Sequence, residues 1–246
     1  MTQQDVSLRY RVFCCDYDGT LASEGLVPAD ALASLKGLKS AGWNLVMVTG
    51  RILSDLRKVF GRLEIFDRVV LENGGVLYRP EDGSDTVLGP PPPSAFVEIL
   101  RRRGVLPLEV GRVIVATRVP HESVVLEAIR RLGLELQIIF NKGAVMVLPP
   151  GVNKRSGVAA ALGELGLSFH DAVGVGDAEN DLAFLRECEL SVAVANALQS
   201  VIERSHLVTA GARSEGVVEL ASLLLRADQR DRERQRRIER SSMHQS

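Results

Sequence analysis

The stretch YRVFCCDYDGT occupies residues 10–20 and joins an apolar segment to an acidic loop. Residues 10–15 are mostly apolar, with β-branched and aromatic side chains, which is typical of a strand that is covered on both faces. The apolar segment stops at Asp16-Tyr17-Asp18-Gly19, where two carboxylates stand one residue apart and a glycine follows. We therefore predict a buried strand that ends in a polar loop.

Helices and short buried strands alternate in the first 84 residues and again after residue 152. In residues 28–40, Ala31, Leu32, Leu35 and Leu38 recur at helical spacing, and Ala41-Gly42 ends the predicted helix. We expect further strands at 45–48, 68–71, 76–78, 172–175 and 191–194, and further helices at 52–60, 154–165, 180–186, 198–203 and 217–225. This alternation predicts an α/β fold with a parallel sheet that is covered on both faces.

Proline-rich segments enclose the middle of the chain. Gly89 is followed by four prolines, which lack backbone donors and therefore exclude a helix interior or a central strand. Pro149-Pro150-Gly151 stands at the far end, and Asn141-Lys142-Gly143 is a hairpin signal. The elements expected between the prolines are a helix at 94–103, an apolar stretch around 106–108, a strand at 112–117, a helix at 121–132, and strands at 135–140 and 144–148.

This order of helix, strand, strand, helix, strand and strand predicts an α+β cap inserted into the core. We place the cap at residues 85–151, and the split core at residues 1–84 and 152–225. Residues 226–246 form an Arg-rich tail, with seven arginines against four acidic residues, or +7 − 4 = +3. The tail is predicted to be a solvated helix extension or a frayed end, with contact to RNA or an acidic partner as the alternative.

The composition excludes several classes of protein. The 246 residues are 46% hydrophobic and 25% charged, which excludes global disorder. The net charge of −1 gives no overall attraction to nucleic acid or to an anionic membrane. The apolar runs are much shorter than the roughly 20 residues of a membrane span, and no secretory signal is evident, so we expect a cytoplasmic protein. The three cysteines are expected to be buried apolar side chains.

Four polar clusters fall at the ends of predicted strands or at the start of a helix: residues 16–20, residues 49–51, Lys154 and residues 176–181. In an open parallel sheet, ligands bind beyond the carboxyl ends of the strands. One carboxylate pair alone could be a helix-capping turn, but two pairs together with a lysine and a threonine are harder to explain in that way. Converging carboxylates repel one another unless a cation offsets their charge, so the clusters predict Mg²⁺ and a phosphate ligand.

These clusters resemble the four signature motifs of the haloacid dehalogenase superfamily of phosphatases. The matching segments are DYDGT (16–20), VTGR (48–51), the lysine of GVNKRSGV (151–158) and GDAENDLAFL (176–185). The cap lies between the second and third motifs, and this position resembles that of the cap in the Cof-type or IIB branch. That branch includes phosphoglycolate and sugar-phosphate phosphatases. The resemblance implies a Rossmann-like parallel-sheet core with a small αββαββ cap.

The resemblance also implies catalytic roles and metal ligands. Asp16 would attack phosphorus, and Asp18 would protonate the leaving oxygen and later activate water. The metal ligands would be Asp16, the backbone carbonyl of Asp18 and Asp177, with Asp181 either as an additional ligand or as a residue that contacts the ligands.

Other residues would bind phosphate or lie near the site. Thr49, Gly50 and Lys154 would contact the phosphate. Arg51, Asn73 and Asn180 match family positions close to the site. Arg51 could instead be a surface residue, and Asn73-Gly74 an ordinary turn.

The function predicted from these residues is Mg²⁺-dependent hydrolysis of small phosphate monoesters of the phosphoglycolate or sugar-phosphate type, through an aspartyl phosphate. The expected partner is a small phosphorylated metabolite, with neither nucleic acid nor membrane. The alternatives are a phosphomutase of the same branch and a non-catalytic, regulatory phosphoester-binding module. Candidate selectivity residues in the cap are Arg118, His121, Asn141 and Lys142, whose orientation the sequence does not reveal, and the oligomeric state is not predicted.

Overall fold

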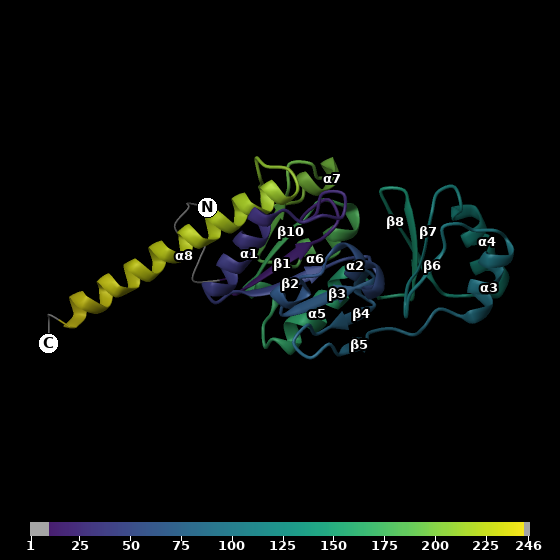
Figure 1. Cartoon of the computed structure of the whole chain (residues 1–246), viewed down its shortest axis with the longest axis horizontal. Coiled ribbons are helices and arrows are strands. Elements are labelled where there is room, and N and C mark those ends of the chain that lie inside the picture. Colours follow the sequence, from purple (N-terminus) through teal and green to yellow (C-terminus); the bar gives the residue numbers. More distant parts are fainter. Residues whose placement is uncertain (1–9, 244–246) are drawn as a thin grey trace.

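An eight-stranded sheet runs through the core in the order β12-β11-β10-β1-β2-β3-β4-β5 (Figure 1). The computed structural model describes residues 10–243. The strands from β12 to β3 are parallel, and β4 and β5 continue the sheet as antiparallel strands. The strands are β1 (Val12–Asp16), β2 (Asn44–Val48), β3 (Arg68–Leu71), β4 (Val76–Tyr78), β5 (Asp85–Val87), β10 (Ala172–Gly176), β11 (Leu190–Ala193) and β12 (Leu207–Val208).

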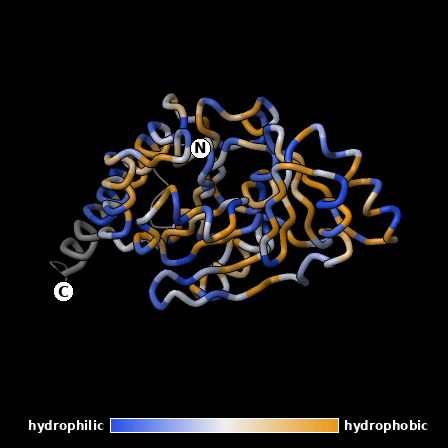
Figure 2. The backbone as a smooth tube through the Cα atoms, turned by 45° about the vertical axis from the view of Figure 1, so that its right-hand side comes forward, coloured by the Kyte–Doolittle hydropathy of each residue, from blue (hydrophilic) through white to orange (hydrophobic). Residues whose placement is uncertain are grey.

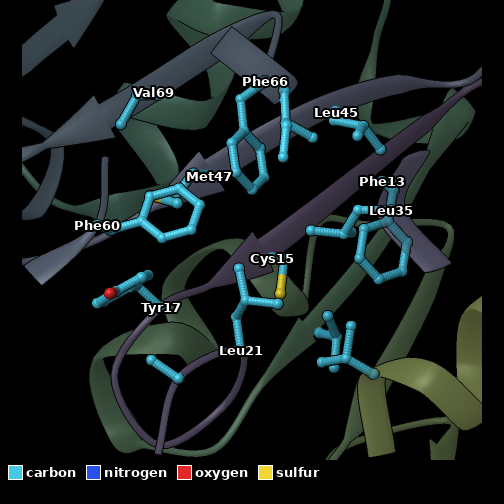
Figure 3. Packing of buried hydrophobic residues seen from close by; sticks show 14 of the residues in the cluster. Phe13, Cys15, Tyr17, Leu21, Leu35, Leu45, Met47, Phe60, Phe66 and Val69 are labelled. Atoms are coloured by element: carbon cyan, nitrogen blue, oxygen red, sulfur yellow. The ribbon is translucent and has the colours of Figure 1, made fainter. Parts of the chain in front are cut away.

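Helices cover both faces of this sheet, because successive side chains of each buried strand point to opposite sides. Phe13 and Cys15 of β1 pack in the cluster that includes Leu35 (Figure 3), whereas Val12 and Cys14 pack in the cluster on the other face. All three cysteines are buried and unpaired, as predicted. The core helices are α1 (Ala29–Ser40), α2 (Leu53–Val59), α5 (Lys154–Glu164), α6 (Leu182–Leu185), α7 (Gln199–Ile202) and α8 (Ser214–Met243), and 3-10 turns occur at η1 (Leu63–Ile65), η2 (Glu72–Gly74), η3 (Phe169–Asp171) and η4 (Glu179–Asp181).

The cap is a two-layer module with its own hydrophobic core. Its antiparallel sheet has the order β6-β7-β9-β8, and two helices cover one face (Figure 1). Phe96 and Val125 of the helices pack against Val145 and Val147 of the sheet, whereas Met146, on the opposite face, belongs to the large cluster of the core. The cap elements are α3 (Ser94–Arg102), β6 (Glu109–Val110), β7 (Val115–Arg118), α4 (Glu122–Leu132), β8 (Gln137–Asn141) and β9 (Ala144–Leu148).

The predicted fold class is confirmed, since a mostly parallel sheet carries a small inserted α+β unit of αββαββ order. Figure 2 shows hydrophobic residues gathered along the strands in the interior. Within residues 10–243, no helix is both long and apolar enough to cross a membrane.

Two predicted domain boundaries differ from the structure. Residues 85–87, placed in the cap by the sequence, form β5 and pair with β4, so they extend the core sheet. All three are exposed, so they lack the buried pattern of the central strands, as does β12 at the other side of the sheet. Residues 214–243 form one continuous helix, α8, which passes through the predicted boundary at residue 226 and confirms a helix extension. Residues 1–9 and 244–246 of the predicted core and tail lie outside the described residues.

Glu72 links the core to the cap through hydrogen bonds. Its buried carboxylate, just beyond β3, accepts hydrogen bonds from the backbone N–H groups of Arg112 (3.0 Å), Val113 (2.8 Å) and Ile114 (3.1 Å). Successive N–H groups of this kind form a concave site for an anion, which the protein here fills with its own side chain.

We expect Glu72→Ala to destabilise the protein by about 3 kcal/mol or more, because each buried N–H left without an acceptor costs about 1–3 kcal/mol. Glu72→Gln is the matched variant, since it keeps an acceptor oxygen, and it should lose clearly less. Urea denaturation of both variants checks this expectation. Equal stability of the two variants would contradict the role of the carboxylate.

Candidate active site

The site lies at the ends of the strands where the strand order of the sheet reverses. From β1 the chain continues through β2 and β3 on one side, and after the cap it returns to β10 on the other side of β1. Asp16 pairs with Val48 in register, which places Thr49 beside it, and Cys15 pairs with Val175, close to Asp177. The predicted clusters therefore converge at one edge, as expected for a site at a switch point.

Lys154 joins two of the carboxylates. Its Nζ donates to Asp16 Oδ1 at 2.6 Å and to Asp181 Oδ1 at 2.5 Å, and its side chain is only 2% exposed. Lys154 is the first residue of α5, whose start is set by a reciprocal capping box between Asn153 and Ser156. Helix capping thus places the lysine at the strand ends, although 138 residues separate it from Asp16.

Burial shifts the pKa values of the charged side chains in the site. Burial raises the pKa of Asp16 well above its usual value, and the Asp181 carboxylate adds to this shift, whereas Lys154 opposes it. Burial also raises the pKa of Asp177, against the effect of Lys142. For Lys154, burial disfavours the charged form, but Asp16 and Asp181 together raise its pKa above the usual value. The lysine therefore stays protonated, and the carboxylates need further positive charge to be fully ionised.

Two glycines allow the close approach of the carboxylates. Gly19 has φ of +87°, and a Cβ there would lie 2.3 Å from Asp177 Oδ2. A Cβ at Gly176, the last residue of β10, would lie 2.8 Å from the Asp181 carboxylate. Asp181 Oδ2 in turn accepts from the backbone N–H groups of Asp177 and Ala178, both at 3.0 Å. A side chain at either glycine would push the acidic loops apart.

The residues fit a hard divalent cation. Asp16, Asp177 and Asp181 each offer a carboxylate oxygen, and these oxygens lie within 4.8 Å of one another. Asp16 Oδ2 and Asp177 Oδ1 are buried and have no hydrogen-bond partner among the described residues. Oxygen ligands of this type suit Mg²⁺. The Asp18 carboxylate is not part of this group and accepts hydrogen bonds from Arg51 instead.

Arg51 contacts Asp18, the predicted acid–base residue. Its guanidinium donates to both Asp18 oxygens, at 2.7 and 2.8 Å, and to Asp55 at 2.6 Å, and it lies 5.7 Å from the centre of the Tyr17 ring. Hydrogen bonding to Asp18 raises the pKa of Arg51. A bidentate pair of this kind fixes the plane of the carboxylate, so Arg51 lies in the site and is not a free surface residue.

The remaining predicted residues also gather at this edge. Thr49 is buried, and its hydroxyl accepts from the Arg51 N–H at 3.2 Å. A Cβ at Gly50 would lie 3.3 Å from Met146 Sδ, so the cap covers this loop. Asn180 Nδ2 donates to Asn73 Oδ1 at 3.1 Å, while Asn73 Nδ2 and Asn180 Oδ1 are buried without a partner among the described residues.

The cap places two cationic side chains on the side of the site. Lys142, in the turn between β8 and β9, forms an ion pair with Asp177. Arg118 pairs with Ala144 and Asn141 also pairs with Ala144, so both lie on the sheet face that carries Met146. His121 instead contacts the Leu106 carbonyl at 3.0 Å and has no described contact with the site.

Sequence reasoning assigned no role to Glu72 or Asn196. Each follows the end of a parallel strand, which is a signal that could have singled them out. The partners of their side chains, at residues 112–114 for Glu72 and at Gly19 and Arg213 for Asn196, come from distant segments that no local pattern identifies.

Comparison with known proteins agrees with this geometry. The family model of haloacid dehalogenase-like hydrolases matches residues 13–98 and 112–220. A phosphoglycolate phosphatase of Methanothermobacter thermautotrophicus is 32% identical over 219 residues, which cover 85% of this chain and 96% of the relative.

Two solved structures share the fold. A haloacid dehalogenase-like hydrolase from Bacteroides thetaiotaomicron has a TM-score of 0.74 at 18% identity, covering 87% of this chain and 99% of the other. A sugar phosphatase of subclass IIB has a TM-score of 0.71 at 17% identity, covering 86% and 98%. With its motifs in order, its sheet and cap, and a family match over most of its length, the chain belongs to the haloacid dehalogenase-like hydrolases.

Proposed function

We propose that the protein is a Mg²⁺-dependent phosphatase that hydrolyses small phosphate monoesters with Asp16 as nucleophile. The observation that carries the proposal is the buried cluster of Asp16, Asp177 and Asp181 around Lys154, with Asp16 Oδ2 unpartnered. Relatives named phosphoglycolate phosphatase support the reaction type.

In the first step, a carboxylate oxygen of Asp16 forms a bond to phosphorus while the bond between phosphorus and the ester oxygen breaks. Asp18 gives its proton to the leaving oxygen as the general acid of this step. Lys154 and Thr49 donate to the phosphoryl oxygens, the electrostatic contribution that dominates phosphoryl transfer. Mg²⁺ bound by Asp16, the Asp18 carbonyl, Asp177 and Asp181 supplies positive charge that offsets the carboxylates and the phosphate.

In the second step, Asp18 takes a proton from water, whose oxygen attacks the phosphorus of the aspartyl phosphate. The bond from phosphorus to Asp16 breaks, which releases phosphate and restores the free carboxylate. Arg51 supports this step, because its two hydrogen bonds fix the plane of the Asp18 carboxylate.

The proposed substrates are small phosphoesters with an anionic leaving group, such as phosphoglycolate. Lys142 and Arg118 bring positive charge to the face of the cap sheet that faces the core. Met146 over Gly50 leaves little separation between cap and core.

The test is release of phosphate from a panel of phosphorylated metabolites, with Mg²⁺ and with EDTA. We expect release only with Mg²⁺, and the highest kcat/KM for small acidic esters. Isomerised sugar phosphate without free phosphate would indicate a mutase, and binding without turnover a non-catalytic module. Either result would sink the proposal.

Lys142→Ala should raise KM for phosphoglycolate by about tenfold, because a charge-assisted hydrogen bond is worth about 1.5–3 kcal/mol. The KM for an ester whose leaving group carries no carboxylate, such as p-nitrophenyl phosphate, should change much less. Steady-state kinetics with both esters measure the difference. Equal changes in KM for both esters would contradict a role of Lys142 in substrate selection.

Mg²⁺ should raise the melting temperature strongly at neutral pH and weakly near pH 5. A ligand at 100 times its Kd stabilises the folded state by about 2.7 kcal/mol. Burial raises the pKa of Asp16 and of Asp177, so protons compete with the metal as the pH falls. Thermal melts with and without Mg²⁺ at the two pH values check this, with Asp177→Asn as the variant that should lose the shift. A shift that does not depend on pH would count against these ligands.

A further inference from the structure

Asn196 lies just beyond the end of β11, at the same edge of the sheet as the acidic cluster. Its Nδ2 donates to the Gly19 carbonyl oxygen at 2.9 Å and lies 3.4 Å from Asp177 Oδ2. Its Oδ1 accepts from the backbone N–H of Arg213 at 2.6 Å. One amide therefore joins the loop after β1, the loop after β10 and the segment that leads into α8.

The first two of these loops are in direct contact. A Cβ at Gly19 would lie 2.3 Å from Asp177 Oδ2, so the Gly19 backbone packs against this carboxylate. Because the peptide unit is planar, a hydrogen bond to the Gly19 carbonyl fixes the whole unit between Gly19 and Thr20. One further peptide unit separates it from the Cα atom of Asp18, so Asn196 restrains the loop that carries the proposed acid–base residue.

Asn196 also restrains the carboxylate of Asp177. Oδ2 accepts from Lys142 and faces Asn196, whereas the buried Oδ1 has no partner within residues 10–243. Because Oδ2 is hydrogen-bonded to protein side chains, Oδ1 remains available to a cation. Partners of this kind orient metal ligands, and their loss typically costs about 10–100-fold in metal affinity or activity.

The third partner of Asn196 is itself firmly held. Arg213 has φ of +52°, a conformation that non-glycine residues adopt rarely and that surrounding contacts must maintain. Its Nη1 donates to Ser23 Oγ at 2.9 Å, and Ser23 pairs with Leu26 in a short bridge. The segment before α8 thus supports both Asn196 and the loop that follows Asp18.

We propose that Asn196 is a positioning residue of the phosphoryl-transfer site, which holds the Asp18 loop and the Asp177 carboxylate in their working arrangement. This inference rests on the proposed function and adds to it a residue that contacts neither phosphate nor water in the reaction. Its effect passes through Gly19 and Asp177.

The experiment compares Asn196→Ala with Asn44→Ala. Asn44 at the start of β2 donates to the Arg11 carbonyl at 3.3 Å, so it makes the same type of bond at the opposite end of the sheet. For Asn196→Ala we expect kcat to fall about 10–100-fold with little change in KM. Mg²⁺ binding to the protein without substrate, measured by calorimetry, should weaken about tenfold. Asn44→Ala should match the wild type in both measurements.

Asn196→Asp provides a second test that preserves the shape of the side chain. The aspartate still accepts from the Arg213 N–H but cannot donate to Gly19, so kcat should again fall about 10-fold or more. Wild-type kcat in this variant, or wild-type kcat and Mg²⁺ affinity in a folded Asn196→Ala protein, would overturn the inference. A wild-type protein with no Mg²⁺-stimulated phosphate release would instead overturn the proposed function. Calorimetry of Mg²⁺ binding would still test whether Asn196 positions the Asp177 carboxylate.

Discussion

Replacing Asp16 by Asn should abolish turnover, with a loss on the order of 10⁴-fold or more, as expected when a covalent nucleophile is removed. The amide keeps the shape of the carboxylate but has neither its charge nor a nucleophilic oxygen. The fold should survive, because Lys154 retains Asp181 as a partner and the mutual repulsion of the buried carboxylates decreases. We therefore expect an inactive variant with a melting temperature equal to or above that of the wild type.

Phosphate release with Mg²⁺, together with a thermal melt, measures both parts of this expectation. Asp30→Asn is the matched control, since Asp30 is exposed in the first turn of α1 and its Oδ1 accepts from the Ala31 N–H, which Asn also can do. The control should have wild-type kcat. Substantial turnover by folded Asp16→Asn would remove Asp16 as the nucleophile.

Replacing Lys154 by Met should cost about 3–5 kcal/mol of stability at neutral pH, because it leaves buried carboxylates without their cation. Methionine fills a similar volume, so the loss reflects charge and hydrogen bonds and not a cavity. Phosphate turnover should also be lost, since Lys154 is a proposed donor to the phosphoryl oxygens. Mg²⁺ should restore part of the stability by supplying positive charge to the same oxygens.

The loss should depend on pH. The pKa of Asp16 is raised in the folded protein, so the folded state binds more protons than the unfolded chain between the two pKa values, and stability falls as the pH rises through that interval. Without Lys154 the folded pKa rises further, so the variant should approach the wild type near pH 4 to 5 and fall behind at neutral pH.

Urea denaturation across this range gives the comparison. Lys39→Met is the control, because Lys39 forms a surface pair with Asp67 at 3.2 Å and should contribute at most about 1 kcal/mol. A Lys154→Met protein that is as stable as the wild type at neutral pH without Mg²⁺ would contradict the charge balance inferred here.

Much of the site could be predicted because its residues lie at fixed places relative to regular elements. Asp16 ends β1, Thr49 follows β2, and Asp177 follows β10, so parallel strands bring them together whatever the details of packing. The cap could be predicted for a similar reason, since prolines interrupt the core pattern and a hairpin signal follows. Buried strands and amphipathic helices produce periodic hydrophobic patterns that can be recognised in the amino-acid sequence.

Other features depend on pairs of residues far apart in the chain. The exposed strand β5 exists only because β4 offers an edge, and α8 continues through charged residues that the sequence marked as a tail. The contacts of Glu72 with the cap, of Arg51 with Asp18 and of Asn196 with Gly19 and Arg213 follow no period.

By itself, then, the sequence determined the α/β core, the inserted cap and the set of acidic and basic groups at the strand ends, because these follow from local patterning. Only the tertiary structure decided which oxygen accepts from which donor, and which carboxylate oxygens remain without a partner. The physical reason is that hydrogen bonds and ion pairs require positions accurate to a fraction of an ångström, which the packing of distant segments sets and no local pattern records.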